Sequence, residues 1–272
     1  MTRVGWIFSL VRSGSSAVAY AAAAPWDLAV ADEPFGPWDR TGPPYNMPAI
    51  QRDLVRAFVA VGHTLTAEIV GMANELFREL AERDDQGRVV CKCPHLLFDP
   101  EQFETWFGGQ ASGVTHAQIA LIRNPLHRVN SAYARGWERL LNDPYELEVY
   151  RTFIDRWKRS RHRFAFDRVT KDPAAAFRDI HKALGFGGTE EDARQSADYL
   201  AGNYHASSAE TSDEATARPR SERGWRAPAD VADVYLADDK ITAFMREMGW
   251  PTRRSAYLGT PLHTLARTLR AT

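Results

Sequence analysis

Short apolar runs alternate with longer amphipathic segments along the chain. The runs have the pattern of strands buried on both faces of a parallel sheet, and they are Val4–Val11, Leu28–Ala31, Arg88–Cys93, Ala117–Ile122 and Arg163–Asp167. Most segments between them have helical spacing, as in Thr66–Arg83 with its stripe of Ile69, Ala73, Leu76, Phe77 and Leu80. Strands that alternate with helices predict an α/β fold, in which a central parallel sheet lies between helices as three α/β/α layers.

The remaining segments predict further helices and three irregular regions. The other predicted helices are the Ala-rich segment before Pro25, Ala49–Val61, Pro100–Trp106, the segment that starts at Pro125, the one from Asp172 to about Gly185, and Val231–Met248. Glu33–Pro48 is dense in Pro, Gly and aromatic residues and predicts a long ordered loop, and residues 203–222 are polar and predict a mobile one. Residues 252–272 carry four arginines and predict a basic helical tail.

Composition narrows the class of protein. The chain has 272 residues, of which 44% are hydrophobic, and this is enough for a full core, so we expect a single domain over residues 1–272. Its 34 Lys and Arg residues nearly balance its 35 Asp and Glu residues. This balance argues against a general nucleic-acid binder, because such proteins neutralise phosphates with clustered cations. Two cysteines cannot build a disulfide framework.

The sequence contains no run of about 20 apolar residues that would predict a membrane span. The stretch Ala17–Ala24 imitates the small-residue end of a signal peptide. Arg12 and the polar run Ser13–Ser16, however, interrupt the apolar segment that a signal peptide requires. We therefore expect a cytoplasmic protein without a membrane span, and its oligomeric state stays open.

The segment Phe8–Ser16 (FSLVRSGSS) joins a predicted strand to a predicted helix through a short turn of serine and glycine. Gly14 lets the backbone approach a ligand, and the N–H groups at the start of the helix can donate to an anion, as can the serine hydroxyls. Arg12 adds a permanent positive charge. No Lys follows Gly14, so this is not a Walker A loop. Taken alone, the segment fits an ordinary strand–helix turn with a serine cap equally well.

A second cationic segment follows the predicted strand Ala117–Ile122. Arg123 comes directly after that strand, and Arg128 and Ser131 lie on the next predicted helix. Ligands of open α/β sheets bind beyond the carboxyl ends of the strands, where Arg12 and Arg123 are both expected. Two anion sites on neighbouring strand ends suit a ligand with two separated anionic groups.

With these two segments the sequence resembles the sulfotransferases that use 3′-phosphoadenylyl sulfate (PAPS), and it is closest in motif to their bacterial and carbohydrate-type members. The residues that resemble the 5′-phosphosulfate loop of the family are Arg12, Ser13, Gly14, Ser15 and Ser16. Arg123, followed eight residues later by Ser131, is similar to the 3′-phosphate motif. A late loop that closes over the 3′-phosphate and adenine is matched loosely by Arg220–Arg226, which points to Arg220, Arg223, Gly224 and Trp225.

The resemblance covers most of residues 3–250 and implies a P-loop-NTPase-like sulfotransferase fold. It implies PAPS as co-substrate, adenosine 3′,5′-bisphosphate (PAP) as product, and no metal. The sulfuryl group would pass in line to a hydroxyl of a small molecule, a carbohydrate or a lipid. Variable loops choose the acceptor in this family, here the segments 34–48, 139–162 and 203–222, so the sequence leaves the acceptor open.

The resemblance also points to catalytic residues. Arg12 would stabilise the leaving phosphate. Glu33 follows the second predicted strand, at the position where carbohydrate-type members carry a catalytic Glu, and is our choice of general base. His95 is the alternative base, because Cys91–His95 is similar to the Lys-Thr-His segment of aryl and steroid members. It is displaced by one residue, which turns a side chain on a strand to the other face. Lys92 would still reach the sulfuryl oxygens.

Three further interpretations accompany these residues. The aromatic residues Phe35, Trp38 and Tyr45 lie in the loop beside the candidate base and are candidates for the wall of the acceptor pocket. A metal site at the Cys-x-Cys-x-His pattern is disfavoured, because no fourth ligand with zinc spacing follows, and buried thiols explain the pattern better. The alternative functions are a P-loop kinase or nucleotide hydrolase, and a non-catalytic nucleotide-binding protein of the same fold.

Overall fold

The computed structural model describes residues 1–35, 48–94, 99–108, 113–134, 136, 144–203, 225 and 227–258. The chain divides into two compact units. The first comprises Met1–Ile122 and Arg156–Glu210, and the second comprises Arg123–Asp155 and Thr211–Thr272.

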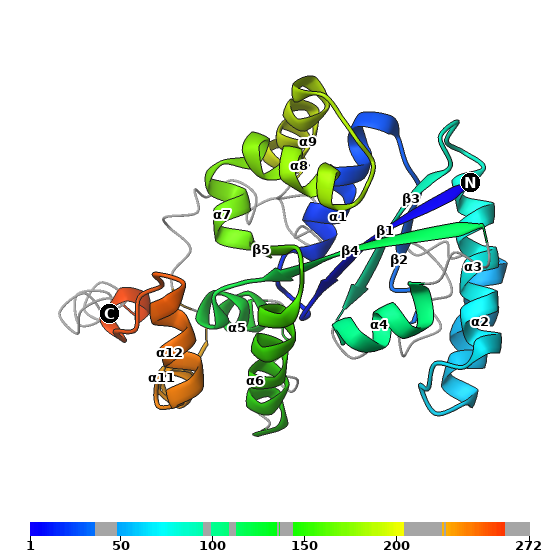
Figure 1. Ribbon diagram of the computed structural model, residues 1–272. Coiled ribbons are helices and arrows are strands. Elements are labelled where there is room, and N and C mark those ends of the chain that lie inside the picture. Colours follow the sequence, from blue (N-terminus) through cyan, green and yellow to red (C-terminus); the bar gives the residue numbers. More distant parts are fainter. Residues whose placement is uncertain are drawn as a thin grey trace. The chain divides into compact units, whose positions relative to one another are not determined.

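The first unit is built on a five-stranded sheet. Its strands are β1 (Thr2–Ser9), β2 (Val30–Asp32), β3 (Arg88–Pro94), β4 (Val114–Ile122) and β5 (Arg163–Ala165). They lie in the order β2-β3-β1-β4-β5, and every neighbouring pair is parallel (Figure 1). This arrangement confirms the predicted α/β class with a central parallel sheet. The carboxyl ends of all five strands consequently lie at one edge.

One face of the sheet packs against α1 (Ser15–Ala23), α8 (Pro173–Ala183) and α9 (Glu190–Asn203), which gather on the same side of the sheet in Figure 1. Ile7 pairs with Ile119 in the sheet register, and the two side chains share this face with Val90 and Leu121. The alanine-rich α1 has small side chains, and these let the helix lie close to the strands. A continuous apolar core fills the layer.

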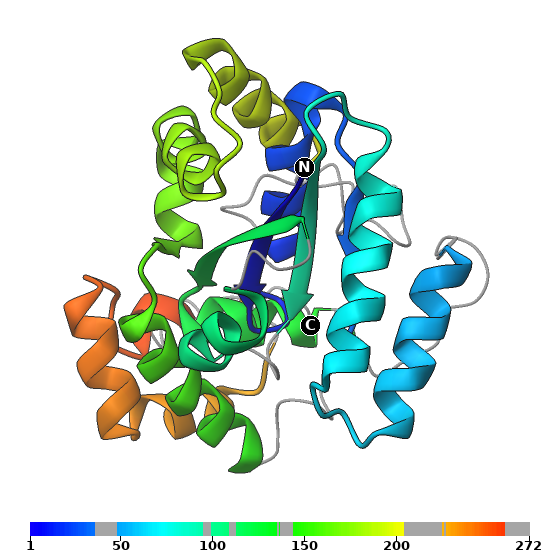
Figure 2. The same cartoon turned by 45° about the vertical axis from the view of Figure 1, so that its right-hand side comes forward.

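The opposite face packs against α3 (Ala67–Ala81) and, through Phe103 and Phe107, against α4 (Pro100–Phe107), while α2 (Ala49–Ala60) packs beside α3 (Figures 1 and 2). Trp6 of β1, which is 1% exposed, lies at the centre of this face. Four phenylalanine rings surround it at centroid distances of 5.0 to 5.6 Å, namely Phe8, Phe77, Phe103 and Phe107. Helices on both faces confirm the three predicted layers.

The second unit contains α5 (Pro125–Tyr133), most of α6 (Pro144–Arg159), α11 (Ala229–Leu236), α12 (Asp239–Glu247) and α13 (Ser255–Leu258). The side chain of Arg128 is fully buried here, and its Nη2 lies 2.6 Å from Glu146 Oε1. Burial opposes the charge on Arg128, but the attraction of Glu146 outweighs it and raises the pKa of the guanidinium. This ion pair ties α5 to α6.

Three predicted boundaries are wrong. The segment 139–162 was expected to be a loop, but α6 occupies Pro144–Arg159, because Tyr150, Phe153, Ile154 and Trp157 form a buried stripe among charged residues. The single helix predicted over Val231–Met248 is two helices, because Asp238 caps α12 by accepting from the N–H of Ile241 at 2.9 Å. The predicted strand Arg163–Asp167 ends at Ala165, where α7 (Phe166–Lys171) begins.

Among the described helices, none is both long enough and apolar enough to cross a membrane. The predicted loop at 203–222 and most of the predicted tail at 252–272 lie outside the described residues, apart from Asn203 and residues 252–258. The prediction of one domain over residues 1–272 stays a prediction.

His116 of β4 is a neutral imidazole within the aromatic face. Its Nδ1 accepts a hydrogen bond from Trp6 Nε1 at 3.0 Å, and its Nε2 lies 3.1 Å from Asn74 Oδ1. The tautomer with the proton on Nε2 satisfies both contacts. Burial lowers the pKa of His116 to about 4. A proton taken up here would therefore destabilise the fold.

We expect the protein to lose stability in mild acid through this residue. An unfolded histidine binds a proton near pH 6.5, whereas folded His116 binds one only near its lowered pKa of about 4. Because of this difference in pKa, lowering the pH from 7 to 5 should reduce the free energy of unfolding by about 2 kcal/mol. His116→Gln should therefore flatten the pH dependence by about that amount in urea denaturation. His63→Gln, at an exposed position, should keep the wild-type slope; an unchanged slope in His116→Gln would contradict the assignment.

Candidate functional site

The loop after β1 turns sharply into α1. Arg12 has φ 65° and Gly14 has φ 87°, so both adopt the left-handed region, and Ser13 between them donates its N–H to Leu10 O at 3.1 Å. This region costs a non-glycine residue free energy, which the surrounding structure must offset. The strained residue at position 12 is the one that the sequence predicts to bind an anion.

Gly14 is required for two separate reasons. Its positive φ disfavours any residue with a Cβ, and a Cβ at this position would lie 2.3 Å from Cε2 of Phe166. Phe166 starts α7 and is 1% exposed, so its ring cannot move aside without disturbing the core. The close packing of the ring on the glycine therefore fixes the path of the loop.

The start of α1 leaves its N–H groups without a side-chain cap. Gly14 is the N-cap, no acidic residue lies in the first turn, and the first N–H that bonds within the helix is that of Val18, to Gly14 O at 3.0 Å. Five other described helices are capped by a side-chain oxygen, namely that of Thr66, Asp99, Asn124, Asp172 or Asp238, whereas α2, α7 and α11 also start without such a cap. An uncapped helix start with positive dipole charge is suited to an external anion.

Lys92, Asp32 and Glu33 form a buried charged cluster at the same sheet edge. The register of β2 and β3 places Asp32 directly opposite Lys92, and Lys92 Nζ lies 2.9 Å from Asp32 Oδ1 and 2.7 Å from Glu33 Oε1. The backbone N–H of Glu33 also donates to Lys92 O at 2.8 Å. One ammonium thus holds two carboxylates, and the cluster carries a net negative charge.

Burial and charge act against each other on Lys92. Burial lowers the proton affinity of its amine, but the attraction of Asp32 and Glu33 outweighs this and raises the pKa, so the ammonium stays charged at neutral pH. The side chain of Glu33 is also buried, at 8% exposure, and its backbone has φ 55°. Arg12 and Glu33, the two residues predicted for catalysis at the ends of β1 and β2, are thus both held in left-handed backbone.

The cysteines of β3 face away from this cluster. Phe8 pairs with Cys93 and Ile7 pairs with Lys92, so Cys93 shares the aromatic face with Phe8 while Lys92 points to the α1 side. Burial raises the pKa of Cys93 to about 12 and that of Cys91 well above its usual value, so both thiols stay protonated.

The described residues contain no group of three or more His, Cys, Asp or Glu side chains that could hold a metal.

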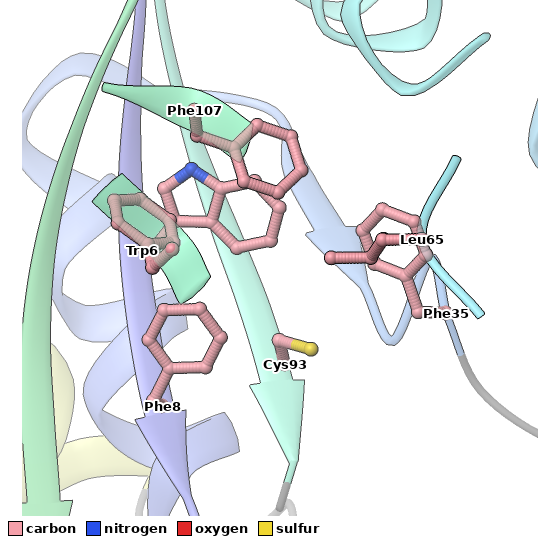
Figure 3. Close-up of a pocket in the computed structure, with 7 residues that line it drawn as sticks. Trp6, Phe8, Phe35, Leu65, Cys93 and Phe107 are labelled. Atoms are coloured by element: carbon pink, nitrogen blue, oxygen red, sulfur yellow. The ribbon is translucent and has the colours of Figure 1, made fainter. Parts of the chain in front are cut away.

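A small apolar pocket lies on the aromatic face, as Figure 3 shows. Its lining residues are Trp6, Phe8, Phe35, Leu65, Cys93, Phe103 and Phe107. Phe35 reaches it from the segment that follows Glu33, and its place in the wall of an acceptor pocket stays a prediction. The two other aromatic candidates for that wall, Trp38 and Tyr45, lie outside the described residues.

In the second unit, Arg123 and Asn124 form the turn before α5. Arg123 O accepts a hydrogen bond from the hydroxyl of Tyr150 at 2.7 Å. The side-chain oxygen of Asn124 caps α5 by accepting from the N–H groups of Leu126 and His127 at 3.0 and 3.2 Å. Pro125 occupies the first turn of the helix, where a missing N–H has no cost. This turn is therefore rigidly held.

Ser131 lies on α5, partly exposed, in the second unit. Trp225 is also part of this unit, and its Nε1 donates to Pro228 O at 3.4 Å. Two residues on, the N–H of Ala227 donates to Asn130 Oδ1 at 3.3 Å, which joins this segment to α5. The remaining candidates, His95, Arg220, Arg223 and Gly224, lie outside the described residues.

The structure thus brings Glu33 and Lys92 into contact, and it places the Arg12 loop, with Ser13, Ser15 and Ser16, at the same edge of the same unit. Two strand spacings separate β1 from β2, about 10 Å. No local pattern in the sequence points to Asp32 as a partner of Lys92. Asp32 stands beside Glu33 in the sequence, but only the register of β2 on β3 reveals the ion pair.

No protein-family model matches the chain, and no curated protein matches it in sequence. Among solved structures, the mouse sulfotransferase SULT7A1 complexed with PAP is similar at 11% identity and a TM-score of 0.44, over 90% of this chain and 82% of that one. Retinol dehydratase with retinol and PAP is similar at 16% identity and a TM-score of 0.43, over 91% and 80% of the two chains. The same enzyme with androsterone and inactive cofactor PAP has 16% identity and a TM-score of 0.40, over 90% and 78%.

We expect Gly14→Ala to destabilise the first unit. The added Cβ meets the ring of Phe166 and forces a left-handed backbone on alanine, at a combined cost of about 2–4 kcal/mol of unfolding free energy. Gly71→Ala is the matched control, because a Cβ on this exposed position of α3 meets no atom within 4 Å, and alanine favours the helix. Denaturant unfolding of both variants measures the difference, and equal stability of the two would contradict the packing role of Gly14.

Proposed function

We propose that this chain is a sulfotransferase that moves a sulfuryl group from PAPS to an acceptor hydroxyl. The observation that carries the proposal is that two features occur together at one edge of one sheet. One is the uncapped start of α1, which follows the strained Arg12 loop, and the other is the buried ion pair of Glu33 and Lys92. The first feature suits an anionic donor, and the second suits proton transfer beside it.

The loop of Arg12 binds the 5′-phosphosulfate in this proposal. The N–H groups of Ser15 and Ser16 lie in the first turn of α1, and the guanidinium of Arg12 adds a fixed positive charge. As the bond from sulfur to the phosphate breaks, negative charge grows on the bridging oxygen. Donors that are already oriented stabilise this charge without reorganisation, so the loop contributes to the rate as well as to binding.

Glu33 acts as the general base. The acceptor oxygen forms a bond to sulfur while the bond from sulfur to the bridging oxygen breaks, and the electron pair of the broken bond leaves on PAP. The acceptor proton passes to the carboxylate of Glu33. Lys92, which Asp32 keeps paired after Glu33 is neutralised, retains a counter-charge and stays a cation near the transferred group. Asp32 thereby supports the charge of Lys92 during turnover.

Residues of the second unit bind the 3′-phosphate and the adenine of the nucleotide. Arg123 supplies the charge, Ser131 supplies a hydroxyl, and Trp225 supplies a ring for stacking. The rigid turn at Arg123 supports this role, because a held backbone lowers the entropy that is lost on binding. Roles for Arg220, Arg223 and Gly224 in the same half of the site rest on the sequence resemblance alone.

The acceptor is a hydroxyl of a small molecule, a carbohydrate or a lipid. The apolar pocket walled by Phe35 has room for about one water molecule in this structure, so the class of acceptor rests on the sequence resemblance. A cytoplasmic location and the absence of nucleic-acid partners stay predictions from the sequence, as does His95 as an alternative base.

We expect PAP to bind the protein in calorimetry without added metal. Arg12→Ala should weaken this binding by at least tenfold, because it removes a charge-assisted contact to phosphate worth about 1.5–3 kcal/mol. Arg83→Ala, on the exposed segment after α3, should bind as the wild type does. If the wild-type protein does not bind PAP but hydrolyses ATP with Mg²⁺, the kinase or hydrolase class is correct instead.

We expect Glu33→Gln to keep PAP binding and to lower kcat by about 10²–10⁴-fold, because glutamine cannot accept the acceptor proton. Transfer of radiolabelled sulfate from PAPS to a panel of hydroxyl compounds measures the rate. Glu75→Gln, an exposed position of α3, is the control and should keep full activity. A near-normal rate in Glu33→Gln would assign the base to another residue, and PAPS binding without any transfer by the wild type would indicate a non-catalytic protein.

A further inference from the structure

Two tyrosines from distant parts of the second unit hold the turn that carries Arg123. Tyr150 of α6 donates its hydroxyl proton to Arg123 O at 2.7 Å. Tyr257 of α13 receives a hydrogen bond on its hydroxyl oxygen from Asn124 Nδ2 at 2.9 Å. The two contacts hold consecutive residues, so the direction in which the chain leaves Arg123 is set from both sides.

Asn124 depends on this arrangement for its orientation. Its side chain is fully buried, its oxygen caps α5, and its amide nitrogen donates to Tyr257. If the amide rotated by half a turn, the nitrogen would face the N–H groups of α5 and the cap would be lost. The hydroxyl of Tyr257 therefore selects the orientation of Asn124 that begins the helix directly after Arg123.

Tyr257 has contacts beyond this hydrogen bond. Its hydroxyl donates to Pro251 O at 2.7 Å, which closes the segment before α13 on itself. Its ring meets the ring of His127 edge-on at a centroid distance of 5.7 Å, and that of Trp225 at 6.3 Å. One side chain thus contacts the start of α5 and the aromatic residue that the proposed function assigns to adenine.

We propose that Tyr257 is a positioning residue for the half of the nucleotide site that recognises the 3′-phosphate. It sets the backbone at Arg123 through Asn124, and it sets the ring of Trp225 by direct contact. This inference rests on the proposed function, and it assigns to the segment Pro251–Leu258 a role in donor recognition that its sequence does not indicate.

A purely structural role would give a different result. The helix α13 has four residues and no buried one, and Tyr257 itself is half-buried. Removal of its hydroxyl therefore opens no cavity in a core. The ring contact with Trp225 is kept, so the effect falls on Asn124 and the turn at Arg123 and should depend on whether the ligand carries a 3′-phosphate.

The test compares two nucleotides in calorimetry, PAP and adenosine 5′-monophosphate, which lacks the 3′-phosphate. Tyr257→Phe should raise the Kd of PAP by about fivefold, the value of one hydrogen bond, and change the Kd of the monophosphate by less than twofold. At saturating PAPS, kcat should stay at the wild-type value while KM for PAPS rises. Tyr199→Phe, on the surface of α9 in the first unit, is the control and should change neither Kd.

Asn124→Ser provides the second variant, because serine keeps an oxygen for the cap and lacks the amide donor. In this background Tyr257→Phe should weaken PAP binding no further, since the two residues act through one hydrogen bond. Additive effects, or equal weakening of both nucleotides, would overturn the inference. If wild-type protein binds no PAP, the proposed function fails together with it, whereas wild-type binding with an unchanged Tyr257→Phe overturns the inference alone.

Discussion

The central position of β1 in a parallel sheet is the constraint on which the described structure of the first unit depends. β1 is paired on both sides, to β3 and to β4, and its residues Val4–Ser9 are buried. The chain leaves such a strand at the edge of the sheet, and the next segment must turn at once into a helix that covers the sheet. The left-handed residues Arg12 and Gly14 and the contact of Gly14 with Phe166 are consequences of that turn.

The same constraint concentrates charge where the strands end. Side chains on the strands are surrounded by apolar layers, so a charged group can be accommodated only near the edge or in a pair. Lys92 is buried, and the attraction of two carboxylates keeps it charged. The cluster is costly to desolvate and contributes little to stability by comparison with an apolar core. Its presence at the edge that also carries the Arg12 loop is better explained by chemistry than by folding.

The sequence predicted much of this fold, and each of its errors has an identifiable cause. Every one of the five strands was anticipated, because buried parallel strands are nearly continuous apolar runs. The helix α6 was missed because charged residues surround its buried stripe, and the division at Asp238 was missed because a cap inside an amphipathic pattern leaves the spacing intact. At the candidate site, Glu33, Lys92 and Arg12 were predicted from motif and position, while Asp32 and Tyr257 were not. Their partners, Lys92 and Asn124, are 60 and 133 residues away in the sequence.

By itself, the sequence determined the class of fold, and it predicted an anion site in the loop after β1 and the candidate catalytic groups. These follow from local spacing, residue type and the order of apolar runs, which are properties of neighbouring residues. Tertiary structure alone decided which charges meet. The register of β2 on β3 sets Asp32 against Lys92, the alternation of β3 turns Cys93 to the face opposite Lys92, and the fold of the second unit brings Tyr257 to Asn124. Pairing across strands and between distant segments depends on packing in three dimensions, and no local pattern encodes it.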